Sequence, residues 1–128
     1  MLAPIIAAAA LITQVLPAPG AIAGWEPLAS DGSGESHLDP ASLSRDGDLV
    51  RFLLRVRLSQ PGPEGMTSLV SRMAVNCPAR TIALEAADFY MPDGTLRMSA
   101  EIPPALRTMG PLDDAVKRAA HARACGAR

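Results

Sequence analysis

The sequence is poor in aromatic residues and in lysine, and each scarcity narrows what the chain can be. One Trp, one Tyr and two Phe among 128 residues mean that a folded core must be built from aliphatic side chains. Lys117 is the only lysine among 12 basic residues, which 13 acidic residues balance to a formal net charge of −1. This near-neutral balance gives no reason to expect a nucleic-acid partner.

Charge is also missing from the N-terminal stretch, where the first charged side chain is Glu26. The apolar run Leu2–Leu16 ends at a proline, and Ala21-Ile22-Ala23 has the small-x-small pattern of a signal-peptidase site. We predict that residues 1–23 are a secretory signal peptide. The alternative is an uncleaved N-terminal anchor, although the run is short and broken by proline for a membrane span.

Removal of that signal leaves residues 24–128, which is 128 − 23 = 105 residues and enough for a single domain. We predict that this domain has no membrane span and lies in the periplasm, on the cell surface or outside the cell. Its two cysteines, Cys77 and Cys125, are typical of a disulfide in an exported chain. Closing the long loop between them stabilises a fold by about 4 kcal/mol in the chain-entropy model.

The clearest secondary-structure signal is the segment Leu49–Leu58. In an extended chain, alternate side chains point to opposite faces, so one face is apolar and the other basic. The apolar face carries Val50, Phe52, Leu54, Val56 and Leu58, and the basic face carries Arg51, Arg55 and Arg57. The next strand, Thr67–Cys77, repeats the pattern and places Arg72 on its polar face.

The remaining segments complete an α+β fold. Further strands are predicted at Trp25–Leu28, Glu35–Leu38, Thr81–Ala86, Phe89–Met91 and Thr95–Ala100, with Asp93-Gly94 as a hairpin turn. A helical turn is predicted to start at Pro40, and Arg45–Asp48 is predicted to be a turn. The result is an antiparallel meander of about five or six strands, followed by a C-terminal helix tied to it by the disulfide.

The C-terminal helix is predicted from apolar residues at spacings of three and four. They are Leu112, Ala115, Val116, Ala119 and Ala122. Pro111 suits the start of this helix. Cys125 falls at the margin of this apolar stripe of the helix, so the last turn is expected to unwind to bring it to Cys77. His121 is expected on the exposed face of the helix.

No residue set has the pattern of a catalyst, and we predict no catalytic residues, no metal site and no cofactor. His121 and Cys125 lie four residues apart on the helix and, with Cys77, are the alternative metal ligands. The acidic turn Asp31–Glu35 has oxygen ligands at alternate positions but lacks the ligand count of a calcium loop. A small periplasmic enzyme or metal-binding protein is the alternative to a non-catalytic binding module.

The basic face of Arg51, Arg55, Arg57 and Arg72 is the one feature with a functional interpretation. It is either a solvated sheet face or a docking surface, because arginine clamps carboxylates and phosphates with two hydrogen bonds. The partner predicted for it is an unidentified protein or a polyanion of the envelope.

Several short motifs occur together in an order that is similar to a known family. They are Trp25 after the signal, His37-Leu38-Asp39 before the Pro40–Leu43 turn, Gly47 before the alternating strand, and Ser71, Cys77 and Cys125 with Tyr90 and Gly94 between the cysteines. The chain resembles the surface-adhesin protein E-like family of small exported bacterial proteins. Phe52 stands where that family often has Trp. The resemblance implies an antiparallel sheet with a helix and an adhesin-like role, without assigning that role to residues of this chain.

Overall fold

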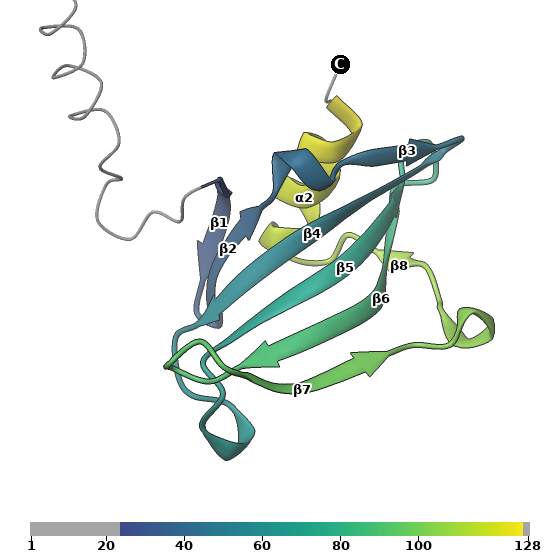
Figure 1. Ribbon diagram of the computed structural model, residues 1–128. Helices are drawn as coiled ribbons and strands as arrows, with labels where there is room; N and C mark the ends of the chain where they lie inside the picture. The colour runs from purple at the N-terminus through teal and green to yellow at the C-terminus, as the bar shows by residue number, and fades with distance from the viewer. Residues whose placement is uncertain (1–23, 127–128) are drawn as a thin grey trace, which may run out of the picture.

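The computed structural model describes residues 24–126, which form an antiparallel sheet with a helix against one of its faces (Figure 1). Six strands follow the order β1-β2-β4-β5-β6-β7, while β3 pairs with β4 and β8 pairs with β6. The elements are β1 (Glu26–Asp31), β2 (Gly34–Leu38), β3 (Ser44–Asp46), β4 (Leu49–Leu58), β5 (Ser68–Asn76), β6 (Thr81–Tyr90), β7 (Leu96–Glu101), β8 (Gly110–Pro111), the helix α2 (Ala115–Gly126), and the 3-10 turns η1 (Pro40–Ser42), η2 (Pro63–Gly65) and η3 (Pro104–Leu106).

The predicted α+β class and the C-terminal helix tied by a disulfide are confirmed, but the predicted number of strands was too small. The sheet has eight strands, because Ser44–Asp46 and Gly110–Pro111 pair as β3 and β8. These two strands are three and two residues long and rich in turn-forming residues, so neither shows an alternating pattern of apolar and polar side chains. The predicted strands Thr81–Ala86 and Phe89–Met91 are instead one strand, β6, which ends at Tyr90.

Strand β4 has the bounds and the two faces that its alternation predicts. Val50 lies opposite Val75 of β5 and Phe52 lies opposite Met73, so the apolar face of β4 continues into β5. We call this the helix face, because α2 packs on it, and we call the opposite face the outer face. The 3-10 turn η1 follows β2 beside β4, where Ser42 Oγ accepts a hydrogen bond from the Leu53 N–H at 2.8 Å.

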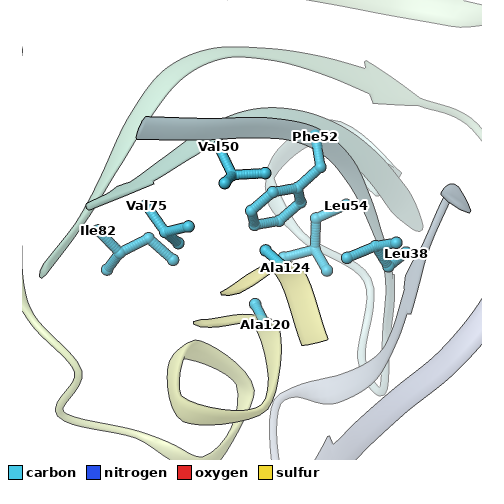
Figure 2. Packing of buried hydrophobic residues seen from close by; sticks show 8 residues of the cluster. All are labelled: Leu38, Val50, Phe52, Leu54, Val75, Ile82, Ala120 and Ala124. Atoms are coloured by element: carbon cyan, nitrogen blue, oxygen red, sulfur yellow. The ribbon is translucent and has the colours of Figure 1, made fainter. Parts of the chain in front are cut away.

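The hydrophobic core lies between the helix face and α2 (Figure 2). Its largest buried side chain is Phe52, which is 1% exposed. The other members are Leu38, Val50, Leu54, Val75, Ile82, Ala120 and Ala124. Burial of one aliphatic or Phe side chain of this kind contributes about 1.5–3 kcal/mol to the stability of the fold. Within residues 24–126, no helix is long and apolar enough to cross a membrane.

The buried face of α2 differs from the predicted one. Ala120, His121 and Ala124 are buried, whereas Ala115 and Ala122 are exposed. Alanine occurs all around this helix, so apolar spacing alone does not fix the side that faces the sheet. Cys125 remains inside α2 and its Cα lies 5.6 Å from that of Cys77, which means that the expected unwinding of the last turn was wrong.

The start of α2 is set by Asp114 rather than by Pro111, which lies in β8. The Asp114 carboxylate accepts a hydrogen bond from the Lys117 N–H at 2.8 Å, as a helix cap does. We expect Asp114→Ala to lower the free energy of unfolding by about 1 kcal/mol in urea titrations. Asp113→Ala is the control, because Asp113 contacts the exposed Lys117 ammonium at 2.7 Å, caps no backbone group and should have a smaller effect. Equal losses would contradict the capping role.

The two predicted turns, at residues 31–34 and at Asp93-Gly94, are each ordered by the hydrogen bonds of an aspartate. Asp31 Oδ1 accepts hydrogen bonds from the Ser33 hydroxyl at 2.6 Å and the Ser33 N–H at 2.8 Å, and Asp93 Oδ1 does the same for Thr95. These bonds favour the ionised carboxylates and lower the pKa of Asp31 and of Asp93. Their contribution to stability is therefore present at neutral pH and is lost as the pH falls through these lowered pKa values.

Candidate functional site: the outer face of the sheet

The four arginines predicted as a basic face do share the outer face. In the β4–β5 register Arg72 lies opposite Leu53, on the same side of the sheet as Arg51, Arg55 and Arg57. Their environments differ, however, and divide them into two pairs. Arg51 and Arg72 are held by neighbouring carboxylates, whereas Arg55 and Arg57 lie farther along β4.

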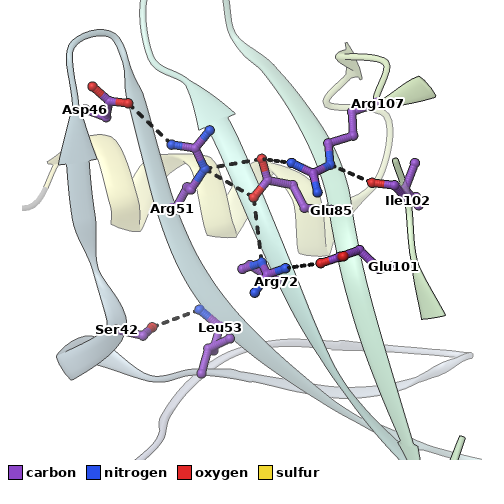
Figure 3. A network of polar contacts seen from close by, with 9 residues as sticks. All are labelled: Ser42, Asp46, Arg51, Leu53, Arg72, Glu85, Glu101, Ile102 and Arg107. Atoms are coloured by element: carbon purple, nitrogen blue, oxygen red, sulfur yellow. Dashed lines mark hydrogen bonds and ion pairs between the residues drawn. The ribbon is translucent and has the colours of Figure 1, made fainter. Parts of the chain in front are cut away.

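Arg51 and Arg72 converge on Glu85, a residue that the sequence interpretation did not select (Figure 3). The Glu85 side chain is only 7% exposed. Arg51 Nε donates to its two oxygens at 3.1 and 3.2 Å, Arg72 Nε lies 3.9 Å from Oε1, and Arg107 Nη1 lies 3.7 Å from Oε2. Three guanidinium groups thus compensate one buried carboxylate.

A bulge in β6 explains why Glu85 faces the arginines. Arg72 pairs with Ala86 and Met73 with Leu84, so Glu85 is the extra residue between them. A bulge re-aims the side chain of the inserted residue, and here it brings Glu85 to the outer face. The segment after β7 then covers it, because the Glu85 carbonyl accepts from the Ile102 N–H at 2.9 Å and Arg107 Nε donates to the Ile102 carbonyl at 2.8 Å.

Two arginines of this Glu85 cluster, which consists of Glu85, Arg51, Arg72 and Arg107, each contact a further carboxylate. Arg51 Nη1 lies 3.6 Å from Asp46 of β3, and Arg72 Nη2 donates to Glu101 of β7 at 3.0 Å. Charge pairs therefore join five strands, β3 to β7, across the outer face. Arg51 and Arg72 serve the fold, and little of their charge remains for a partner.

Far fewer carboxylates compensate the charges of Arg55 and Arg57. Arg57 Nη1 lies 3.8 Å from Glu35 of β2, and both side chains are about half exposed. Such an exposed pair is worth little and is readily exchanged for another partner. Arg55 makes no ion pair within residues 24–126.

These two arginines line a pocket of about 650 Å³ on the outer face. Ser68, Val70, Tyr90 and Met91 also line it. A second pocket of about 510 Å³ adjoins it and shares Val70 and Tyr90. The two form one hollow across β4, β5, β6 and β7, with Arg55 and Arg57 at one end and Asp88 and the Arg72–Glu101 pair at the other.

His37 lies beside this surface but does not open into it. It pairs with Arg55 in the β2–β4 register, which places it on the outer face as a strand residue. Its side chain is buried, and within residues 24–126 its Nδ1 has no hydrogen-bond partner. Ser36, on the opposite face, donates to the Ala29 carbonyl at 2.9 Å, so the two neighbours do not act together.

The three residues considered as alternative metal ligands, Cys77, His121 and Cys125, have structural roles instead. Cys77 and Cys125 form the disulfide, and His121 is buried, not exposed as expected, with Nε2 3.2 Å from the Cys77 carbonyl oxygen. The expectation was wrong because the disulfide turns this side of α2 towards the sheet. Among residues 24–126, no group of three His, Cys, Asp or Glu is placed to hold a metal ion.

Residues 25–126 match the family model of surface-adhesin protein E. Solved structures of Haemophilus influenzae protein E have the same fold. One is 20% identical with a TM-score of 0.60, covering 88% of this chain and 91% of that one. The crystal form II structure is 18% identical with a TM-score of 0.60, covering 88% and 94%. No curated protein sequence matches the chain.

Proposed function

Because the chain belongs to the surface-adhesin protein E family, we propose that it is an exported, non-catalytic binding module of the bacterial envelope, periplasmic or at the cell surface. The family supports an adhesive role, and the disulfide supports export, since such bonds persist in oxidising compartments. The predicted signal peptide, residues 1–23, lies outside the described residues, and its removal is part of this proposal.

The binding site that we propose is the pocket of Arg55 and Arg57, and its occupant is an acidic segment of a partner protein. The observation that carries this proposal is the unequal compensation of the outer-face arginines. Arg51 and Arg72 are used by Glu85, whereas Arg55 has no ion pair within the described part of the chain. An arginine in the wall of a pocket whose lining contains no Asp or Glu is ready to clamp a carboxylate from a partner.

The spacing of the two arginines specifies the form of that segment. Residues two apart on one face of a strand are separated by about 7 Å. This spacing equals the separation of carboxylates at alternate positions of an extended peptide. Val70, Tyr90 and Met91 add apolar wall to the pocket, which suits a peptide with hydrophobic side chains better than a polysaccharide.

We expect Arg55→Ser/Arg57→Ser to weaken binding of an extended peptide with alternating Glu and Val by at least about tenfold. Fluorescence anisotropy with the labelled peptide measures this. The affinity of the unsubstituted protein should fall as salt rises, because exposed charges are screened beyond about 8 Å at physiological ionic strength. The fold should be retained, since substitutions at outward strand positions change stability by about 0.5 kcal/mol or less.

Arg45→Ser/Arg118→Ser is the charge-matched control. Both arginines are exposed and lie away from the pocket, on β3 and α2. Equal weakening by both double variants would mean that net charge, not this pocket, attracts the peptide. Binding of heparin with no binding of the peptide would contradict the proposed partner in favour of a polyanion.

Export is tested separately by the intact mass of the protein recovered from cell fractions. A mature species beginning at Gly24 in the periplasm or outer envelope is the expected result. A species that retains Met1 in the inner membrane would contradict export as a released module and restore the N-terminal anchor.

A further inference from the structure

Asp88 is a half-buried carboxylate on the outer face, at the opposite end of the hollow from Arg55 and Arg57. It belongs to β6 and pairs with Val70, which in turn pairs with Arg55. Within residues 24–126 its side chain makes no ion pair and no hydrogen bond. A carboxylate that has lost part of its hydration and has no partner is ready to accept a cationic group from outside the chain.

The charges of the hollow are divided between its two ends. The pocket at the Arg55 end is lined by two arginines and by no Asp or Glu. The pocket at the other end is lined by two carboxylates, Asp88 and Glu101, and by one cation, Arg72. Arg72 donates to Glu101 at 3.0 Å and also lies near Glu85 (Figure 3). Arg72 is therefore already compensated, and Asp88 gives this end of the hollow a negative charge.

The register of the sheet fixes the position of Asp88 relative to the arginines. Two neighbouring rows of outer-face residues cross β4, β5 and β6 here, and they are Arg55–Val70–Asp88 and Arg57–Ser68–Tyr90. Adjacent strands are about 4.8 Å apart, so the backbones of Arg55 and Asp88 are separated by about 10 Å. The outer face of β5 is thus a floor with positive charge on its β4 side and negative charge on its β6 side.

An extended peptide lying along β5 would meet both sides of this floor, because its successive side chains point in opposite directions. When its residues i and i+2 point towards Arg55 and Arg57, residue i+1 points towards β6, midway between Asp88 and Tyr90. Tyr90 lines both pockets, so its ring is open to the hollow. A Lys or Arg at i+1 would pair with the Asp88 carboxylate and pack its aliphatic stem on the Tyr90 ring.

We propose that Asp88 determines the specificity of the hollow by binding a basic side chain, so that the partner segment is extended and has the pattern acidic–basic–acidic. This inference rests on the proposed function of the Arg55 and Arg57 pocket, and it adds the requirement for a central cation. Asp88 also disfavours uniformly acidic ligands, because it repels them at one end of the hollow while the arginines attract them at the other.

Two labelled peptides that differ at one position test the inference by fluorescence anisotropy. One alternates Glu and Val, and the other has Lys in place of the Val between its two central Glu residues. We expect the Lys peptide to bind the unsubstituted protein about fivefold more tightly, although its net negative charge is smaller. Asp88→Asn should weaken binding of the Lys peptide and strengthen binding of the Glu–Val peptide, because it removes both an attraction and a repulsion.

Asp48→Asn is the matched control. It removes an exposed carboxylate between β3 and β4, away from the hollow, and should leave the preference for Lys unchanged. Circular dichroism checks that both variants are folded, and the comparison of the two peptides on the unsubstituted protein needs no variant. Equal affinities in that comparison, or a preference for Lys that survives Asp88→Asn, would overturn this inference and leave the Arg55 and Arg57 pocket as proposed. Binding of neither peptide would overturn the proposed function as well.

Discussion

Replacing Glu85 by Gln should destabilise the fold more than any other single charge change in the sheet. Removal of one partner of a buried ion pair costs about 3–5 kcal/mol when the remaining charge is fully buried. Arg51, Arg72 and Arg107 are 38%, 45% and 23% exposed, so water compensates part of their charge. We therefore expect a loss of about 2–3 kcal/mol in the free energy of unfolding, measured by urea titration.

Glu101→Gln is the matched control for this substitution. It also removes a carboxylate from Arg72, but Glu101 is exposed and its pair with Arg72 is worth at most about 1 kcal/mol. A similar loss for both variants would mean that Glu85 contributes only as one more surface charge. In that case the Glu85 cluster would not be what holds Arg51 and Arg72 away from a partner.

A double-mutant cycle with Arg107 tests the mechanism of the loss. Arg107 is the least exposed of the three cations, and it contacts Glu85 from the segment after β7. Arg107→Met should destabilise the unsubstituted protein through the lost ion pair. In the Glu85→Gln background the same change should cost less, because it removes an uncompensated charge. Additive effects would contradict a coupled network.

The strands with long alternating patterns could be predicted from the sequence, and the short ones could not. The ten residues of β4 reveal both faces and its bounds, because each additional residue repeats the same signal. Strands β3 and β8 are only three and two residues long. They form because backbone groups of β4 and β6 beside them are free to pair. Their pairing is a tertiary effect with no local pattern.

The two arginine pairs could not be separated from the sequence for a similar reason. Alternation correctly places Arg51, Arg55 and Arg57 on one face, but it does not say which carboxylates reach them. Glu85 is the deciding residue, and it faces the arginines only because a bulge inserts it into β6. One signal was available: Glu85 is the one charged residue between Thr81 and Ala87, where the other side chains are small or apolar.

The face of α2 was mispredicted because alanine gives little contrast between its sides. The side that faces the sheet is instead fixed covalently, through Cys125. Residues one turn apart share a face, so His121 follows Cys125 to the sheet and meets the Cys77 carbonyl. The disulfide thus decides the orientation of the helix as well as its attachment, and its removal should have the largest effect of all.

Cys77→Ser/Cys125→Ser should lower the free energy of unfolding by about 4 kcal/mol, and the midpoint of thermal unfolding by roughly 15–30 °C. The helix has little else to hold it, because its fully buried apolar residues are Ala120 and Ala124. Amide exchange by mass spectrometry should then be fastest in α2, with β4 and β5 still protected. The native protein in excess reductant should behave like the double variant, and reductant should not change the variant further. A loss below about 1 kcal/mol, or unchanged protection of α2, would show that packing alone fixes the helix.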